Sequence, residues 1–592
     1  MSSGTNNAYI LSFLALGFFL AAGVLYVFGL GAPGLFDVLE ARSAVVSSQA
    51  SSLVTALVNP TINAMPPDQG APLFYGLQKL SMGAFGETVF AARLPSALAA
   101  FFMVFTFYNS VWLLTHARRY ALLAAAALAL SPGVLIAARL GTPDALVTFL
   151  TLAATMMLMG NIYQRERSYL RLFVVGLVMG LAFLAGGGVW AVILPFVAAF
   201  MLALVKDHRS YNIASLAPLS VVVAAGLALF PWLIAVLERK GTEGLGDMMF
   251  NMSHLQGDVG GVQAHHWWGP LAALAVLTLP WVFFALPRLW PGFKGIFKNI
   301  DNLDVRESLP PLALIWLAGG IGLMAVGIAL EGMTINTEFA MDYTPGIFLF
   351  SLWLSAPVAL LAADFFDRLP QQGLILPWFA LLFVLTIALS VLFFWLPHMA
   401  DILLGREGYE GFQKLLEGVG VLGEFQGGFW QGVLSVKPDW GLTPVVMGAL
   451  VLVTLLMGGY LMSHGALEGA LFVFVGMWFT MFFAAHGLTA PVYEHLQQPL
   501  KWMSVKVKKE HEATPESTRA RVVLYAIDRP SVSYVTGLQP YKTNTPQAAF
   551  STTALPLFVL TDKTHMPQLA PHVPAGAAHE CFGGYCLIEV HR

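Results

Sequence analysis

The chain has 592 residues, of which 57% are hydrophobic and only 11% are charged, and its formal net charge is −3. Soluble domains carry about 25% charged residues, so this composition excludes an ordinary soluble protein and indicates a membrane protein. The small net charge gives no support to nucleic-acid binding. The first apolar stretch is too long for a cleaved signal peptide, and it lacks the basic start and the small-residue cleavage site.

Apolar windows of about 20 residues, each long enough to cross a bilayer core, recur along the chain. Very short turns around 138–143 and 186–187 separate two neighbouring pairs. We predict thirteen membrane-spanning helices, near 8–30, 90–114, 119–137, 143–163, 169–185, 188–205, 213–237, 268–290, 309–331, 345–364, 373–397, 443–463 and 466–490.

Positive charge predicts the orientation, because loops rich in Lys and Arg stay in the cytoplasm. Alternate loops carry Arg118 and Arg119; Arg165, Arg167 and Arg171; Lys206 and Arg209; and Arg288, Lys294, Lys298 and Arg306. The N-terminus is then cytoplasmic, and an odd number of spans puts the tail outside. Four segments are expected on that outer side: 31–89, 238–266, 398–442 and 491–592.

The tail after Pro491 has the pattern of a small α/β domain. The stretch "ARVVLYAIDRPSVSYVTG" predicts a strand and then a loop that enters a short helix, and "LPLFVLTD" predicts another strand. About 90 residues suffice for one such domain, although its burial is marginal.

Both cysteines lie in the tail, in "ECFGGYC". The two glycines are a two-residue hairpin signal, which places Cys581 opposite Cys586 at a close pair of strand residues. An oxidising outer compartment favours a disulfide between them. Nearby His579 and His591 leave a structural metal site as the alternative.

Charged residues gather in the outer loops. The first outer loop begins "GLFDVLEARSAVVSSQ", with Asp37, Glu40 and Arg42, and the next outer turn, "ARLGTPDAL", carries Arg139 and Asp144. Each has a purely structural alternative, since polar residues mark the interface and acids begin helices as caps or dipole partners. Together they favour a cavity at the outer leaflet that handles a charged lipid headgroup.

Order and spacing point to a family. The run "APLFYGLQKLSMGAFGETVFAARLPSAL", followed by "ARLGTPDALVTF" and "GLAFLAGGG", resembles the GT-C glycosyltransferases, in the branch of the lipid A aminoarabinose transferase and the protein O-mannosyltransferases. The resemblance covers nearly the whole chain. It implies a polytopic α-helical GT-C membrane domain over 1–490, with interfacial helices in the first outer loop at 31–89. A small outer α/β domain is expected over 491–592.

The resemblance also implies an activity. Such enzymes move a sugar from a polyprenyl-phosphate carrier to a lipid or glycan acceptor, such as a lipopolysaccharide-type lipid, at the periplasmic face of the bacterial inner membrane. A carboxylate positions or deprotonates the acceptor, and cations stabilise the departing phosphate. The candidate catalytic residues are then Asp37, Glu40 and Asp144, and the candidate donor-phosphate ligands are Arg42, Arg139 and Lys79. A snorkelling Lys79 is the structural alternative.

The sequence departs from the family pattern at chemical positions. Leu39 stands where the first-loop aspartate is expected, and Gln69 and Gly70 replace a Glu-Lys pair. Gly186 replaces the next lysine, and Glu338 reverses the charge of the last one. Asp37, two residues upstream of the missing aspartate, could substitute for it.

Three functions are compatible with this pattern. The first is a working glycosyltransferase. The second is a catalytically degenerate homologue that binds a lipid-linked sugar or scaffolds a protein partner. A transporter is the third and weakest, because the two halves show no inverted repeat with broken helices. No cofactor is required, although a divalent metal near His265 and His266, just before an aromatic run, is an alternative.

Overall fold

The computed structural model describes most of the chain. The described residues are 2–32, 34–61, 70–164, 168–206, 209–254, 269–298, 305–333, 347–372, 440–464, 466–513, 521–551 and 555–591, with short stretches between 383 and 394. Most of the predicted span at 373–397 and of the outer segment 398–442 lies outside them, as do residues 255–266 of the outer segment 238–266.

The described part of residues 1–513 is helical, as its apolar windows predict. The helices are α1 (Ser2–Val27), α2 (Arg42–Gln49), α3 (Leu53–Val58), α4 (Pro72–Phe85), α5 (Val89–Thr115), α6 (Arg118–Ala129), α7 (Pro132–Arg139), α8 (Asp144–Gln164), α9 (Tyr169–Ala182), α10 (Trp190–Val205), α11 (Arg209–Ser215), α12 (Pro218–His254), α13 (Gly269–Leu277), α14 (Trp281–Lys298), α15 (Val305–Met333), α16 (Ile347–Gln372), α20 (Thr443–His464), α21 (Ala466–Phe483), α22 (Thr489–Leu496) and α23 (Gln498–Ala513). Short π-helical turns η1 (Asp37–Ala41), η2 (Phe183–Gly187) and η3 (Ala484–Leu488) lie among them.

Eight of the described helices are long and apolar enough to cross a membrane, or up to ten if each bent pair counts as one span. The total of thirteen therefore stays a prediction. Two predicted spans are not straight helices: α6 and α7 meet at 62°, and α13 and α14 meet at 119°. Pro132 begins α7 and Pro280 precedes α14, and proline breaks a helix because it lacks an N–H and clashes with the preceding turn.

The membrane domain has buried helices at its centre and more exposed apolar helices at its periphery. The span in α8 is 83% buried and that in α16 is 89% buried, whereas the span Tyr211–Arg239 is only 28% buried. Helix α8 packs against α5, α9 and α10, and α16 packs against α6, α14 and α15. A buried ion pair joins α14 to α16, where Arg288 Nε donates to Asp364 Oδ2 at 2.5 Å.

The first loop folds into short helices, and their place at the membrane interface stays a prediction. After η1, helices α2 and α3 lead to α4, which packs along α5. Helix α4 begins with Pro72, whose fixed φ suits a first helical position. Thr88 caps α5, since its side chain accepts from the Ala91 N–H at 3.2 Å.

The tail contains a five-stranded sheet with the order β2-β1-β3-β5-β4. The strands are β1 (Arg521–Tyr525), β2 (Tyr541–Thr543), β3 (Leu557–Asp562), β4 (Ala578–Phe582) and β5 (Tyr585–Val590). Strand β1 is parallel to β2 and β3, whereas β5 is antiparallel to β3 and β4. Helices α23 and α24 (Pro530–Thr536) contribute to the core on one face, and α25 (Pro546–Ala549) and α26 (Met566–Leu569) contribute to the core on the other.

Cys581 and Cys586 form a disulfide across the β4–β5 hairpin, where the register pairs them directly. Gly583 turns the hairpin with a φ of +61°, and a Cβ there would lie 2.5 Å from Pro499 Cγ at the start of α23. Glycine is therefore required both by the turn and by the close approach of the hairpin to the helix.

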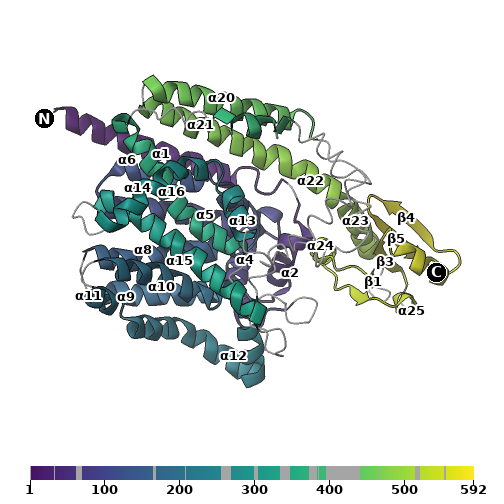
Figure 1. The fold of residues 1–592 in the computed structure, drawn as a ribbon. Helices are drawn as coiled ribbons and strands as arrows, with labels where there is room; N and C mark the ends of the chain where they lie inside the picture. The colour runs from purple at the N-terminus through teal and green to yellow at the C-terminus, as the bar shows by residue number, and fades with distance from the viewer. Residues whose placement is uncertain are drawn as a thin grey trace.

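The helical bundle, the helices of the first loop and the sheet of the tail follow one another along one direction of the molecule. Figure 1 shows the N-terminus at one end of the helical bundle and the sheet at the other, with α2, α4 and α24 between bundle and sheet. The first loop and the tail therefore meet at the same end of the bundle.

Candidate functional site

Glu40 anchors the first loop to the membrane domain through a buried ion pair. Its carboxylate receives Arg93 Nε at 2.9 Å and also Arg93 Nη2. Both residues are about 1% exposed. Arg93 also donates to the carbonyl oxygens of Leu30 (2.9 Å) and Gly34 (2.7 Å). The planar guanidinium is thus bound on several sides, a geometry that lysine could not supply.

The same carboxylate reaches the turn before α8. Gly141 N donates to Glu40 Oε2 at 2.6 Å, and Ser43 Oγ donates to the Gly141 carbonyl oxygen at 2.7 Å. Gln78 joins this network through long contacts of 3.4 Å from its Nε2 to Ser43 Oγ and to the Gly141 carbonyl oxygen, and it also donates to the Ala92 carbonyl oxygen on α5 at 2.8 Å. Glu40 is therefore a positioning residue that fixes the turn three residues before Asp144.

Asp144 differs from the other candidate acids in how few hydrogen bonds its carboxylate receives from the described residues. It is the first residue of α8 and is 7% exposed, and its Oδ2 is buried with no hydrogen-bond partner among the described residues. The buried hydroxyl of Thr148, one turn later, is likewise unpaired among them. Burying a carboxylate oxygen without a hydrogen-bond donor lowers the stability of the folded protein. Such an atom is therefore typical of a functional site, where a ligand supplies the missing contact.

Asp37 is bound to the tail, so the structural alternative of a cap on the helix that follows it does not apply. It accepts from Ser531 N at 2.6 Å, from Ser531 Oγ at 2.8 Å and from Gln497 Nε2 at 2.9 Å. Ser531 is the second residue of α24, so Asp37 supplies the N-terminal acceptor of a helix 494 positions away in sequence. Burial raises the pKa of Asp37, and the charge of Arg529 and the hydrogen bonds from Ser531 offset part of that rise.

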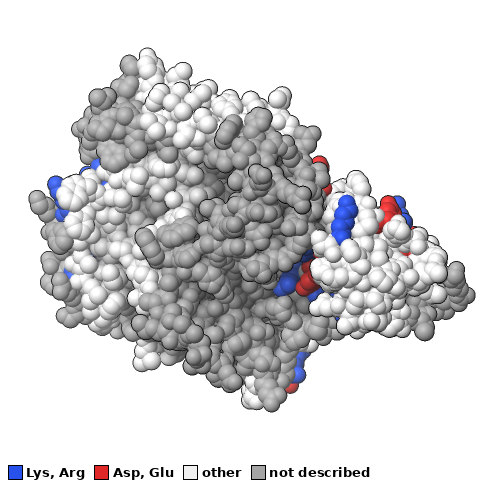
Figure 2. All heavy atoms as spheres, turned by 45° about the vertical axis from the view of Figure 1, so that its right-hand side comes forward, with Lys and Arg blue, Asp and Glu red and all other residues white. Residues whose placement is uncertain are grey.

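Arg42 makes a second link between the first loop and the tail. Its Nη2 lies 3.1 Å from Asp528 Oδ2, and Lys542 Nζ lies 2.7 Å from Asp528 Oδ1. The side chains of Arg42 and Asp528 are 36% and 41% exposed, so this pair is worth little in stability. Figure 2 shows basic and acidic side chains together where the tail meets the helical bundle.

The other two candidate phosphate ligands are bound to backbone carbonyl oxygens. Arg139 Nη1 donates to Leu25 (3.0 Å) and Phe28 (2.9 Å) at the end of α1, where a cation complements the helix dipole. Lys79 Nζ donates to the Ser48 carbonyl oxygen at 3.2 Å. The structure therefore brings Asp37, Glu40 and Arg42 into one interface with α5 and the tail, whereas Arg139 and Lys79 each stabilise a helix end.

The loss of the family lysine at Gly186 has a backbone explanation. Gly186 lies in η2 with a φ of +107° and is buried. A Cβ there would lie 3.1 Å from the Cβ of Ala71, next to Gly70. A lysine at this position would need a strained backbone, so glycine is favoured here by the backbone conformation as well.

We expect Gly186→Ala to lower the free energy of unfolding by about 1–3 kcal/mol, because the positive φ disfavours any side chain. Thermal unfolding of the purified protein measures the effect. The matched control is Gly226→Ala in α12, where a Cβ meets nothing within 4 Å. Equal unfolding temperatures for the two variants would contradict the explanation.

Asp37→Ala is expected to loosen the tail from the bundle. It removes the acceptor of the Ser531 N–H and leaves Gln497 unpaired, which costs about 1–3 kcal/mol. Hydrogen exchange of residues 530–536 in the full-length protein should become faster, whereas exchange in β3 should be unchanged.

The matched control for Asp37 is Asp562→Ala. Asp562 accepts similar bonds from Thr564 N (3.0 Å) and His565 N (2.8 Å), but within the tail domain. This control should weaken the local turn and leave exchange in α24 as it is. Unchanged exchange of 530–536 in Asp37→Ala would show that the two parts stay together without this contact.

Some predicted positions cannot be placed. His265, His266, Gln69 and Glu338 lie outside the described residues, so the alternative of a metal at the two histidines stays a prediction.

Sequence reasoning missed three residues of this region. Arg93 was noted only as part of the "RLPSAL" motif, and its pairing with Glu40 was not predicted. Ser531 follows the proline of "RPSVSYVTG", which signals a helix start but names no partner. Tyr534 in the same helix was also missed. Its hydroxyl is buried without a hydrogen-bond partner among the described residues.

Comparisons with known proteins agree with this architecture. Residues 68–234 match the family described as dolichyl-phosphate-mannose-protein mannosyltransferase. That segment runs from the described α4 into α12 and includes Arg93, Arg139, Asp144 and Gly186, but not the first-loop residues Asp37 to Arg42. No curated protein sequence matches the chain.

The fold is similar to that of ArnT from Cupriavidus metallidurans, solved bound to undecaprenyl phosphate and in the apo state. Both structures have a TM-score of 0.68 at 15% identity, over 99% of this chain and 98% of theirs. The archaeal oligosaccharyltransferase AglB from Archaeoglobus fulgidus is more distant, with a TM-score of 0.44 at 12% identity, over 98% of this chain and 74% of its own. The predicted fold class is confirmed: the chain is a multi-pass membrane protein with the GT-C fold and a small C-terminal sheet domain.

Proposed function

We propose that this GT-C protein transfers a sugar from a polyprenyl-phosphate carrier to a lipid or glycan acceptor of the cell envelope. The observation that carries the proposal is the buried Oδ2 of Asp144, which has no hydrogen-bond partner within the described part of the chain and lies inside the segment that matches a family of dolichyl-phosphate-mannose-dependent transferases. The likeness to a fold solved with undecaprenyl phosphate supports a polyprenyl carrier.

The chemistry needs one proton acceptor. The acceptor hydroxyl oxygen forms a bond to C1 of the sugar while the bond between C1 and the phosphate oxygen breaks. The hydroxyl proton passes to a carboxylate, and the electron pair of the broken bond stays on the phosphate. Asp144 is assigned as this general base, since Asp37 and Glu40 already accept several hydrogen bonds each.

The departing phosphate needs a cation. Among the three predicted ligands, Arg42 fits best, because it is partly exposed and its partner Asp528 is also partly exposed. An exposed ion pair of this kind is worth only about 0.2–1 kcal/mol, so a phosphate can replace the carboxylate with a bidentate contact. Arg139 and Lys79 are assigned structural roles at helix ends.

The reaction is assigned to the outer face of the bacterial inner membrane, with the N-terminus in the cytoplasm and the tail in the periplasm. The support is the distribution of Lys and Arg among the loops, together with the position of the tail beside the first loop.

A second candidate is a catalytically degenerate protein that binds a lipid-linked sugar. It is favoured by the commitment of Asp37 to the tail and of Glu40 to Arg93, which removes both first-loop acids from direct chemistry. This candidate requires the lipid but no transfer.

Two measurements on the same strain test the function. Lipid extracted from the purified full-length protein is analysed by mass spectrometry for a polyprenyl phosphate, and envelope glycans are compared between wild-type and deletion cells. We expect the lipid to be present and one glycan modification to disappear in the deletion. Retained lipid with identical glycans would favour the second candidate, and absence of both effects would overturn the proposal.

A further inference from the structure

We propose that Glu510, Glu589 and His591 form a binding site for a divalent transition-metal ion in the tail domain, with Zn²⁺ as the best fit. This site lies apart from the residues assigned to sugar transfer and does not depend on that assignment. It is carried by the geometry of three side chains that come from two different elements.

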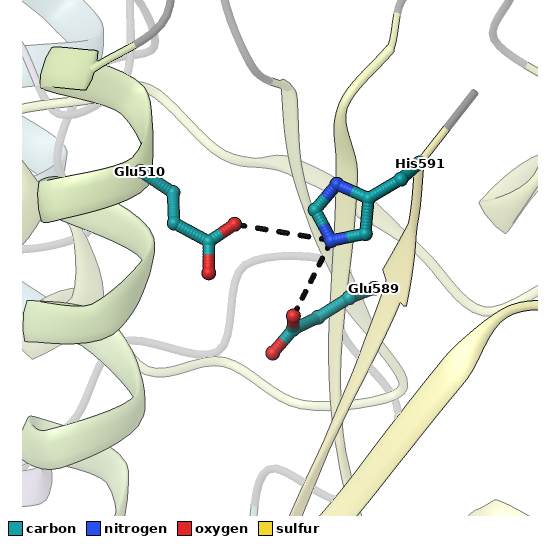
Figure 3. A group of neighbouring side chains, drawn as sticks. All are labelled: Glu510, Glu589 and His591. Atoms are coloured by element: carbon teal, nitrogen blue, oxygen red, sulfur yellow. Dashed lines mark hydrogen bonds and ion pairs between the residues drawn. The ribbon is translucent and has the colours of Figure 1, made fainter.

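Glu510 lies on α23, Glu589 lies on β5 and His591 follows β5 directly. Figure 3 shows the imidazole between the two carboxylates, with its Nε2 facing both. Nε2 is 3.9 Å from Glu510 Oε2 and 3.5 Å from Glu589 Oε2, and one ligand atom of each residue lies within 4.8 Å of the others. Ligands of one tetrahedral Zn²⁺ lie roughly 3.4 Å apart, given metal–ligand distances of about 2.0–2.2 Å, so a small closure suffices.

Two neighbours hold the ligands in place. The Glu589 side chain is only 8% exposed, and its Oε1 is bound by Lys506 Nζ at 2.5 Å, which leaves Oε2 turned toward His591. The ring of Phe558 lies edge-on to the imidazole, with the ring centroids 6.2 Å apart and the planes at 85°. Such supporting contacts orient metal ligands before the ion binds.

The local charge also favours a cation. Lys506 bridges Glu589 and Glu580, so this lysine already serves two carboxylates while Glu510 adds a third acidic group beside His591. The three glutamates and Lys506 together carry a formal charge of about −2, which suits a divalent ion.

The donor set selects the kind of ion. One imidazole nitrogen and two carboxylate oxygens suit Zn²⁺ and similar first-row metals, whereas Mg²⁺ and Ca²⁺ prefer oxygen ligands alone. A fourth position would remain for water. The ion would join α23, the helix that leads from the membrane domain to the sheet, to the last strand of that sheet.

The test is isothermal titration of full-length protein in detergent, stripped of metal with chelator, with zinc chloride and separately with magnesium chloride. We expect one Zn²⁺ per chain and no Mg²⁺ binding at the same concentrations. His591→Ala and Glu510→Gln should each weaken Zn²⁺ binding at least tenfold. Both residues are partly exposed, so neither substitution disturbs the core.

The matched control is His579→Ala, which removes an exposed histidine from β4 in the same sheet. It should leave the Zn²⁺ affinity unchanged. X-ray absorption at the zinc edge should show one nitrogen and otherwise oxygen neighbours. Equal affinities for wild type, His591→Ala and Glu510→Gln, or a comparable loss in His579→Ala, would mean an adventitious ion only and would overturn the proposal.

Discussion

Replacing Arg93 with methionine is expected to lower the free energy of unfolding by about 3–5 kcal/mol, because it leaves the buried carboxylate of Glu40 without its partner charge. The carbonyl oxygens of Leu30 and Gly34 lose their donors at the same time. The total free energy of unfolding of a protein domain is only about 5–15 kcal/mol, so we expect little folded protein to be recovered from membranes.

The measurement is the unfolding temperature and monodispersity of the detergent-solubilised variant. Arg118→Met is the matched control, since Arg118 also belongs to a helix of the bundle but makes an exposed contact to Ser12 Oγ. Adding Glu40→Gln to Arg93→Met should recover part of the lost stability, because it removes the unpaired charge. If the destabilisations caused by Arg93→Met and by Glu40→Gln simply added up in the double variant, the two residues would not be directly coupled, which would contradict the prediction.

Asp144→Asn is expected to reduce sugar transfer by roughly 10²–10⁴-fold, the usual contribution of a positioned acid–base group. Asparagine has nearly the same shape but cannot take the acceptor proton. Because the Oδ2 atom it replaces has no partner among the described residues, no hydrogen bond of that oxygen is lost. Removing a buried charge should leave stability equal or higher.

Sugar transfer is measured in membranes that carry equal amounts of wild type, Asp144→Asn and Asp37→Asn, together with the unfolding temperature of each. We expect a loss of activity without a loss of stability only for Asp144→Asn. If Asp37→Asn instead loses transfer while its tail stays docked, the catalytic acid is Asp37 and the assignment of Asp144 is wrong. If all three transfer equally, neither acid is the general base.

The fold was predictable because its signals are local. Apolar runs of the right length identified helices such as α5 and α8, and short continuous apolar runs identified β1 and β3. The bends between α6 and α7 and between α13 and α14 were missed, because hydropathy reports length and not direction. The prolines at these breaks were the available signal.

The site was predictable only as a set of candidates. The sequence named Asp37, Glu40 and Asp144, but it could not rank them, since ranking depends on partners far away in the chain. Asp37 is bound by a helix 494 positions later, whereas Asp144 has one oxygen that receives no hydrogen bond from any described residue. No local pattern encodes that difference. Gly186 was likewise interpretable only once its φ was known.

The contact between Asp37 and Ser531 has a consequence for the order of events during synthesis. A ribosome that adds about 5–20 residues per second makes Ser531 roughly 25–100 s after Asp37, given the 494 positions between them. During most of that interval the first loop is complete but Asp37 has neither of its tail partners, since Gln497 also lies late in the chain. The loop can reach its final arrangement only when the last sixth of the chain has emerged. A truncated product would therefore carry an unsatisfied carboxylate. Quality-control proteases can distinguish it from the finished protein by this group.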